Sequence, residues 1–157
     1  MKTVRPDIKR FTSSGYIDDM ATGNLCVAIG YGGDLNIAKT RARESANGVD
    51  IKVLVPTTGV GVWVDSLMIP RDAQNVANAH KYINHTLDPK VAAQNGSFVT
   101  YAPASLPARE LMDEKYTSDA SIFPTKELMQ KSFIVSPKSS DVSRLSVRLW
   151  QSLKAGK

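Results

Sequence analysis

The chain has 157 residues, of which 42% are hydrophobic and 22% charged, and its formal net charge is +5. This length suffices for one domain or for part of a larger one, and the composition is that of a folded chain. No apolar stretch approaches the roughly 20 residues of a membrane-spanning helix, so we expect a soluble chain. The single cysteine, Cys26, excludes an intramolecular disulfide, and its apolar surroundings predict a packed thiol.

The predicted elements alternate between strands and helices. Short apolar or alternating runs bounded by turn residues indicate strands at 8–11, 25–30, 51–55 and 61–69, with a short extended piece at 98–101. Capping residues ahead of helically spaced apolar residues indicate helices at 14–23, 35–46, 72–83, 89–96, 106–112 and 125–130, and a last one from about 140. Helices that separate covered strands predict an α/β layered fold.

The positive charge raises nucleic acid as a possible partner. The densest basic group lies at positions 39–43 and is followed by Glu44, and a second set lies on the predicted C-terminal helix. We interpret both as solvated helix faces and therefore predict no nucleic-acid partner. Salt-dependent retention on DNA is the test that would favour the opposite interpretation.

The segment 30–34 (Gly-Tyr-Gly-Gly-Asp) follows a predicted strand and opens a predicted helix. Ligands of open α/β sheets bind beyond the carboxyl ends of strands, and glycines at such a turn let a ligand approach the backbone. The spacing differs from GxGxxG because Asn36 fills the last position, and Asp34 would repel a phosphate, so a nucleotide site is not favoured. The structural alternative is that Asp34 simply caps the helix.

Two further features break the expected pattern. Asp65 is an acid inside an otherwise apolar predicted strand, where an isolated carboxylate is costly without a partner or a cation. Asp65 is therefore either paired with a lysine or arginine, or held at a cleft for a cationic ligand. An aromatic tip with Tyr101 precedes a proline turn at 98–103, and this pattern alone is more typical of packing.

Together these features supply two carboxylates, Asp34 and Asp65, and three aromatic rings, Tyr31, Trp63 and Tyr101. Carboxylates accept strong charge-assisted hydrogen bonds from ammonium groups. Aromatic faces hold a methylene chain and attract ammonium groups. The set is suited to a slender organic cation.

The same residues resemble the periplasmic polyamine-binding proteins of bacterial ABC importers, especially the putrescine-binding type. The matching stretches are 14–19, 26–34, 65, 68–70, 101–104 and 148–157, so that the resemblance covers essentially the whole chain. It implies that Asp34 and Asp65 clamp ammonium groups while the rings of Tyr31, Trp63 and Tyr101 enclose the carbon chain. Tyr31 stands where the putrescine type usually has tryptophan, and Trp63 where it usually has phenylalanine, which leaves the preferred polyamine open.

The resemblance also implies an incomplete periplasmic binding protein of type II-like α/β fold. We expect the C-terminal half of a longer family chain, with 1–62 and 105–157 in one lobe, 63–104 in the other, and a hinge crossing between them. Such a protein captures a polyamine in the periplasm and delivers it to an ABC transporter permease, although this chain shows no signal peptide. Alone, it is expected to lack a complete pocket and to expose apolar surface that a missing N-terminal half or a swapped dimer covers.

No catalytic, metal or cofactor site is predicted. His80 and His85 are five residues apart, so they do not share a helix face as metal ligands at i, i+4 do. No G-x-S-x-G motif marks a nucleophile. Two alternatives stay open: a binder of another cationic small molecule, and a truncated fragment without independent binding.

Overall fold

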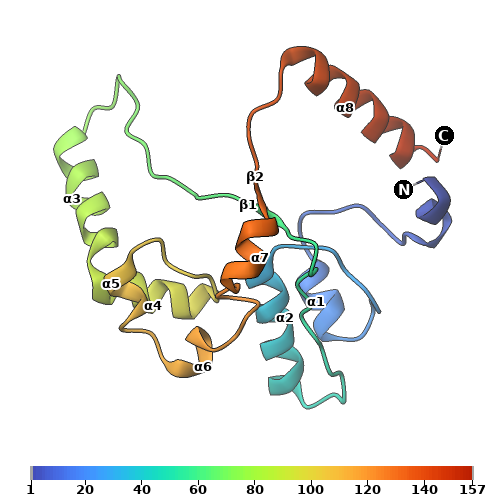
Figure 1. Cartoon of the computed structure of the whole chain (residues 1–157), viewed down its shortest axis with the longest axis horizontal. Helices are drawn as coiled ribbons and strands as arrows, with labels where there is room; N and C mark the ends of the chain where they lie inside the picture. Colours follow the sequence, from blue (N-terminus) through green and yellow to red (C-terminus); the bar gives the residue numbers. More distant parts are fainter. Residues whose placement is uncertain (1, 157) are drawn as a thin grey trace.

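The computed structural model describes residues 2–156, and helices dominate it (Figure 1). A 3-10 helix, η1, covers Lys2–Asp7. The α-helices are α1 (Tyr16–Ala21), α2 (Gly32–Ser45), α3 (Val76–Leu87), α4 (Pro89–Val99), α5 (Leu106–Arg109), α6 (Glu114–Thr117), α7 (Lys126–Lys131) and α8 (Ser140–Lys154). The strands are β1 (Gly61–Val62) and β2 (Phe133–Ile134), which pair in parallel with Gly61 opposite Phe133. Among the described helices, none combines the length and the apolar character needed to cross a bilayer.

Helices with strong local start signals were predicted correctly. The predictions at 72–83, 89–96, 125–130 and from 140 are confirmed as α3, α4, α7 and α8. In three of these helices a side-chain oxygen accepts an N–H group of the first turn, from the caps Asp88, Thr125 and Ser139. Such a cap satisfies a donor that has no partner inside the helix and contributes about 1 kcal/mol.

Most of the predicted strands are wrong. Residues 8–11, 25–30 and 51–55 have no sheet neighbour, only Gly61–Val62 pairs within 61–69, and Phe98 and Val99 belong to α4. A strand exists only with a hydrogen-bonded neighbour. Between residues 2 and 156 the one ladder is that of β1 with β2, so the expected layered sheet is reduced here to a two-residue parallel pair surrounded by helices.

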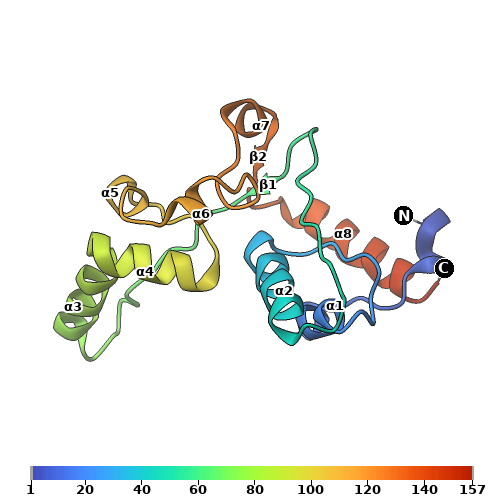
Figure 2. The same ribbon diagram turned by 90° about the horizontal axis from the view of Figure 1, so that it is seen from below.

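Two small hydrophobic clusters organise the described residues. The first joins α1, α2 and the segment 51–55 through Met20, Ala21, Ala38, Ala42 and Ile51. The second joins α4 to α5 and to the loop after α5, through Ala93, Ala108 and Met112. Both views separate a group formed by α3 to α6 from a group formed by α1 and α2, with α8 and η1 together beyond α1 (Figures 1 and 2).

The second cluster bears on the expected division into lobes. Tyr116 and Phe123 pack against this cluster, so that the region from α5 to Phe123 lies with α4. The chain meets α2 again just before Phe123, where Lys39 forms an ion pair with Asp119 at 3.6 Å. Residues 119–123 therefore contact both α2 and the α4 group, and the chain passes from one group to the other along this segment.

Much apolar surface is exposed in this structure. Its accessible area is 12066 Å², about one and a half times the roughly 7,800 Å² expected for a compact monomer of this mass. Val27, Ile29 and Leu54 are 81%, 99% and 82% exposed. Cys26 is exposed as well, so the predicted packed thiol is wrong, because no described segment covers that side of 25–30. The expectation of exposed apolar surface is confirmed.

Candidate functional site

The start of α2 carries two of the predicted site residues. Tyr31 is the N-cap, in extended conformation, and Asp34 lies in the first turn. The helix begins earlier than predicted, so Asp34 is not its cap. A carboxylate in the first turn is nevertheless stabilised by the free N–H groups and the helix dipole. Asp34 is half-buried.

Tyr16, which the sequence analysis did not select, contacts both of these residues. Its hydroxyl donates to Asp34 Oδ2 at 2.5 Å and accepts the N–H of Tyr31 at 3.3 Å. The side chain is buried, and its ring lies so close to Gly30 that a Cβ there would come within 2.7 Å of Cε2. Burial and the hydrogen bond to Asp34 raise the pKa of Tyr16 to about 12, so the hydroxyl keeps its proton at neutral pH.

Tyr101 reaches the same helix start from the loop after α4. A Cβ on Gly33 would lie 1.9 Å from Cε2 of the Tyr101 ring. Thr100 fixes this loop on α2, because its hydroxyl donates to the Gly33 carbonyl at 3.0 Å. The glycines were expected to admit a ligand, whereas Gly30 and Gly33 here admit two rings of the protein itself.

The pKa of Tyr101 links the two acids to one ring. Burial is the first cause of its raised pKa, followed by the charge of Asp34 and, more weakly, that of Asp65, while the backbone N–H groups of Asp34 and Gly33 act in the opposite direction. Both carboxylates therefore lie close enough to the same phenol to disfavour its ionisation.

The segment after β1 carries Trp63 and Asp65. The Trp63 ring meets the Tyr31 ring with centroids 5.3 Å apart and planes at 72°, which is the favourable edge-to-face arrangement. Asp65 lies three residues beyond the end of β1 and is exposed. The prediction of a buried acid inside a strand is wrong, because residues 63–69 have no sheet neighbour among the described residues.

The five predicted site residues thus gather from three segments: the start of α2, the segment after β1 and the loop after α4. Neither Asp34 nor Asp65 forms an ion pair with a lysine or arginine between residues 2 and 156. The ion pairs found there use Asp18, Asp19, Asp113, Asp119 and Asp141. The charges of both carboxylates act on the Tyr101 ring, and neither is neutralised by an ion pair within these residues. Within the same residues no group of three or more histidine, cysteine or acidic side chains is arranged to hold a metal ion.

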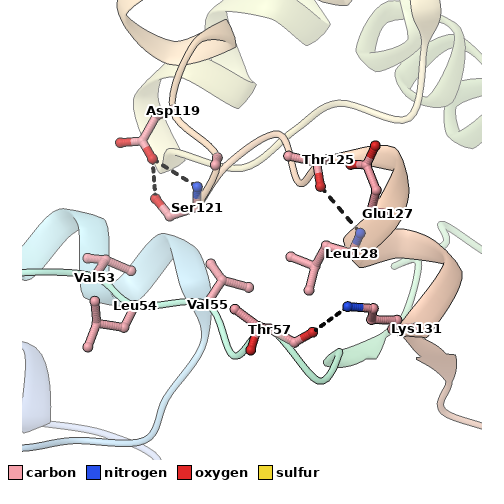
Figure 3. A pocket seen from close by; sticks show the side chains of 11 residues that line it. Val53, Leu54, Val55, Thr57, Asp119, Ser121, Thr125, Glu127, Leu128 and Lys131 are labelled. Atoms are coloured by element: carbon pink, nitrogen blue, oxygen red, sulfur yellow. Dashed lines mark hydrogen bonds between the residues drawn. The ribbon is translucent and has the colours of Figure 1, made fainter.

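Two hollows lie apart from the start of α2. The first, of about 400 Å³, lies between the segment 53–57 and the start of α7, and is lined by Val53, Leu54, Val55, Thr57, Asp119, Ala120, Ser121, Thr125, Glu127, Leu128 and Lys131 (Figure 3). Two of its three charged groups have hydrogen-bond partners in the protein: Asp119 accepts the Ser121 hydroxyl at 2.6 Å, and Lys131 donates to the Thr57 carbonyl at 3.3 Å. The second, of about 630 Å³, runs along β1 and β2 and has Trp63 in its wall. Only Trp63 of the predicted residues lines either hollow.

Comparison with known proteins places these residues in context. The family model described as bacterial extracellular solute-binding protein matches residues 1–130. The putrescine-binding periplasmic protein SpuD of Pseudomonas aeruginosa (strain UCBPP-PA14) is 36% identical over 98% of this chain and 42% of its own length. PotF of Escherichia coli (strain K12), also a putrescine-binding periplasmic protein, is 35% identical over the same shares of the two chains.

A solved structure has a similar fold. The spermidine/putrescine ABC transporter substrate-binding protein PotD from Streptococcus pneumoniae superposes with a TM-score of 0.74 at 26% identity, covering 99% of this chain and 46% of the other. This chain therefore spans less than half the length of the proteins that it matches.

Proposed function

Because the chain belongs to the bacterial extracellular solute-binding protein family, we propose that it captures a polyamine as part of the binding component of an ABC importer. The observation that carries the proposal is the gathering of Asp34 and Asp65, neither paired with a cation, around the ring of Tyr101, beside the Tyr31–Trp63 ring pair. The names of the relatives supply the substrate class and the periplasmic location, and the proposed role is binding without chemical conversion. Delivery to a membrane permease belongs to the same proposal.

The geometry suits a diamine better than a single-headed cation. One ammonium group would bind the Asp34 carboxylate and the other Asp65, with the methylene chain among the rings. A charge pair about 4 Å apart near a protein surface gains about 4 kcal/mol before desolvation, whereas a cation over an aromatic ring gains roughly 0.5–2 kcal/mol. The acids would supply most of the affinity and the rings would select the shape.

We propose that the chain contributes to both lobes of a type II-like binding protein. Residues 1–62 would belong to one lobe and 63–104 to the other, with the β1–β2 pair near the crossing. The expected return at 105 is better drawn after Phe123, because the second cluster packs α5 and Phe123 with α4. The candidate site would then lie where the two lobes meet.

The exposed apolar surface supports docking of a complementary polypeptide. A standard interface removes about 800 Å² from each partner, which is far less than the excess of this chain over a compact monomer. Residues 25–30 and 51–55 have no regular secondary structure, carry several exposed side chains and have no sheet neighbour in the described part of the chain. The occupant we propose is a polypeptide equivalent to the part of the relatives that this chain does not span, because the chain covers only 42% of their length and the remainder would supply both the area and the strand neighbours.

Calorimetry with and without that polypeptide tests the proposal. The chain is titrated with putrescine, cadaverine and spermidine, alone and mixed with the complementary part of SpuD, and 1,4-butanediol serves as an uncharged control of the same length. We expect the complex to bind polyamines and not butanediol. Polyamine binding should be lost in Asp65→Ala and kept in Asp72→Ala, a control substitution at an exposed acid. Light scattering distinguishes the expected one-to-one complex from a dimer of this chain.

The outcomes separate the alternatives. Preference for arginine or lysine would identify another cationic small molecule as the ligand. A complex that forms but binds no cation would refute the proposed function, and binding unchanged by Asp65→Ala would remove that residue from the site.

A further inference from the structure

We propose that Tyr16 is a positioning residue of the candidate site, whose hydroxyl holds the Asp34 carboxylate and the Tyr31 backbone in one fixed arrangement. The inference rests on the proposed function for its consequence in binding. The hydrogen-bonded arrangement of Tyr16, Asp34 and Tyr31 is independent of the proposed function, because it is seen directly in the structure.

Both hydrogen-bonding capacities of the Tyr16 hydroxyl are used. Its single proton goes to Asp34 Oδ2 at 2.5 Å, and its oxygen accepts the Tyr31 N–H at 3.3 Å. In the described part of the chain, no other group accepts the Tyr31 N–H and no other side chain donates to Asp34. The Tyr16 hydroxyl therefore links the carboxylate of Asp34 to the backbone of Tyr31, two of the predicted site residues.

The position of this hydroxyl is built into the fold. Gly15 precedes α1 as its N-cap, and its φ of 77° is one that other residues rarely adopt. The chain thereby enters α1 with Tyr16 at its first residue. Gly30 has no side chain, so the Tyr16 ring can pack directly against the backbone that leads into α2. A Cβ on Gly30 would lie 2.7 Å from Cε2 of this ring. The first cluster packs α1 on α2, so that the donor and the acceptor lie on two helices held together by hydrophobic contacts.

The arrangement has a consequence for the ligand. The phenol occupies one acceptor site of Oδ2, so Oδ1 is the less occupied oxygen of Asp34 and the one we expect an ammonium group to contact. A neutral donor stabilises the half-buried carboxylate without cancelling its charge, as a lysine or arginine would. The Asp34 carboxylate is therefore already oriented and has no cationic partner among the described residues, which lowers the ordering cost of binding a cation.

The test uses Tyr16→Phe, which removes the hydroxyl and keeps the ring, with Tyr82→Phe as a matched control on the exposed face of α3. In the unliganded chain, we expect faster hydrogen exchange of the Tyr31 amide in Tyr16→Phe and no change in Tyr82→Phe. The wild-type chain gives a readout that needs no variant: the Tyr16 hydroxyl proton should exchange slowly enough to be seen by NMR. If neither signature appears, the arrangement is overturned, whatever the chain binds.

The effect on binding is measured in the complex used above. Losing a hydrogen bond to a charged group corresponds to about a 10- to 150-fold weaker affinity for putrescine in Tyr16→Phe. In an Asp34→Asn background the same substitution should have almost no further effect, because the hydroxyl acts through the carboxylate. Equal losses in both backgrounds would mean that Tyr16 only supports packing, and would overturn the positioning role. A wild-type complex without polyamine binding would instead refute the proposed function, and the exchange measurements would still decide the arrangement.

Discussion

Replacing Gly33 with alanine is expected to separate Tyr101 from the start of α2. The added Cβ would lie 1.9 Å from Cε2, 2.3 Å from Cδ2 and 2.5 Å from Cζ of the Tyr101 ring. Side chains in a packed structure do not approach so closely, so the ring must retreat by roughly 1 Å or more. The backbone of Gly33 is helical rather than left-handed, and the contact with the ring is therefore the source of the strain.

The magnitude follows from a comparison with the neighbouring glycine. Overpacking costs about 1–3 kcal/mol, while alanine is favoured over glycine in a helix by up to about 1 kcal/mol. Gly32→Ala has the same propensity gain in the same turn, but its Cβ meets only the Ser121 carbonyl, at 3.4 Å. The difference in unfolding free energy between the two variants isolates the ring contact, and we expect Gly33→Ala to be less stable than Gly32→Ala by about 1–3 kcal/mol.

Urea unfolding of both variants measures this difference, and calorimetry with putrescine in the complex measures its effect on binding. Gly33→Ala should weaken binding and Gly32→Ala should not, because only the former displaces Tyr101 from Asp34. Repeating both in a Tyr101→Ala background should make their stabilities equal. Equal stabilities already in the presence of Tyr101 would refute the reasoning.

Three other predictions concern single groups of the structure. The chain has two tryptophans, and in Trp150→Phe the remaining Trp63 should change its fluorescence on putrescine binding; an unchanged spectrum at saturation would place Trp63 outside the site. The Ser121 hydrogen bonds and Lys39 lower the pKa of Asp119, so its contribution is present above the ordinary value of 3.8 and is lost as the pH falls. Asp119→Asn should therefore cost about 1–3 kcal/mol at pH 7, with the gap closing below about pH 4 in urea titrations. Because burial and Asp34 raise the pKa of Tyr16 from 10.0 to about 12, the wild type should lose stability between those pH values, and a similar loss in Tyr16→Phe would contradict this.

Helices were predictable where the signal is local. Asp88, Thr125 and Ser139 each accept an N–H group two or three residues ahead, and this contact depends on nothing outside the turn. The strands were not predictable in this chain for the opposite reason. The apolar run at 25–30 has the pattern of a covered strand, but that pattern becomes a strand only beside a neighbour, which the described residues do not supply.

The candidate site shows the same division. Asp34 and Tyr31 could be selected from sequence because a glycine-rich turn after an apolar run is a local pattern, whereas Asp65 was selected for a burial that it does not have. Tyr16 was missed because its only local mark is that of a core residue at the start of a short helix. Its hydrogen bond to Asp34 spans 18 positions and depends on how α1 packs on α2.

The β1–β2 pair decides where one side of the candidate site lies. Gly59, with a φ of 103°, lets the chain pass so close to the Lys131 carbonyl that a Cβ would come within 2.1 Å of it. The ladder that follows ends one residue before Trp63, so the contact of this ring with Tyr31 depends on residues more than 60 positions away. A ligand that bridges Asp34 and Asp65 would connect α2 to the β1–β2 ladder. It would make all of its contacts only when α2 and the ladder are correctly placed relative to each other. If the proposed function holds, binding of a diamine and the relative placement of α2 and this ladder would be coupled, and the diamine would shift that placement by as much as it prefers the assembled arrangement.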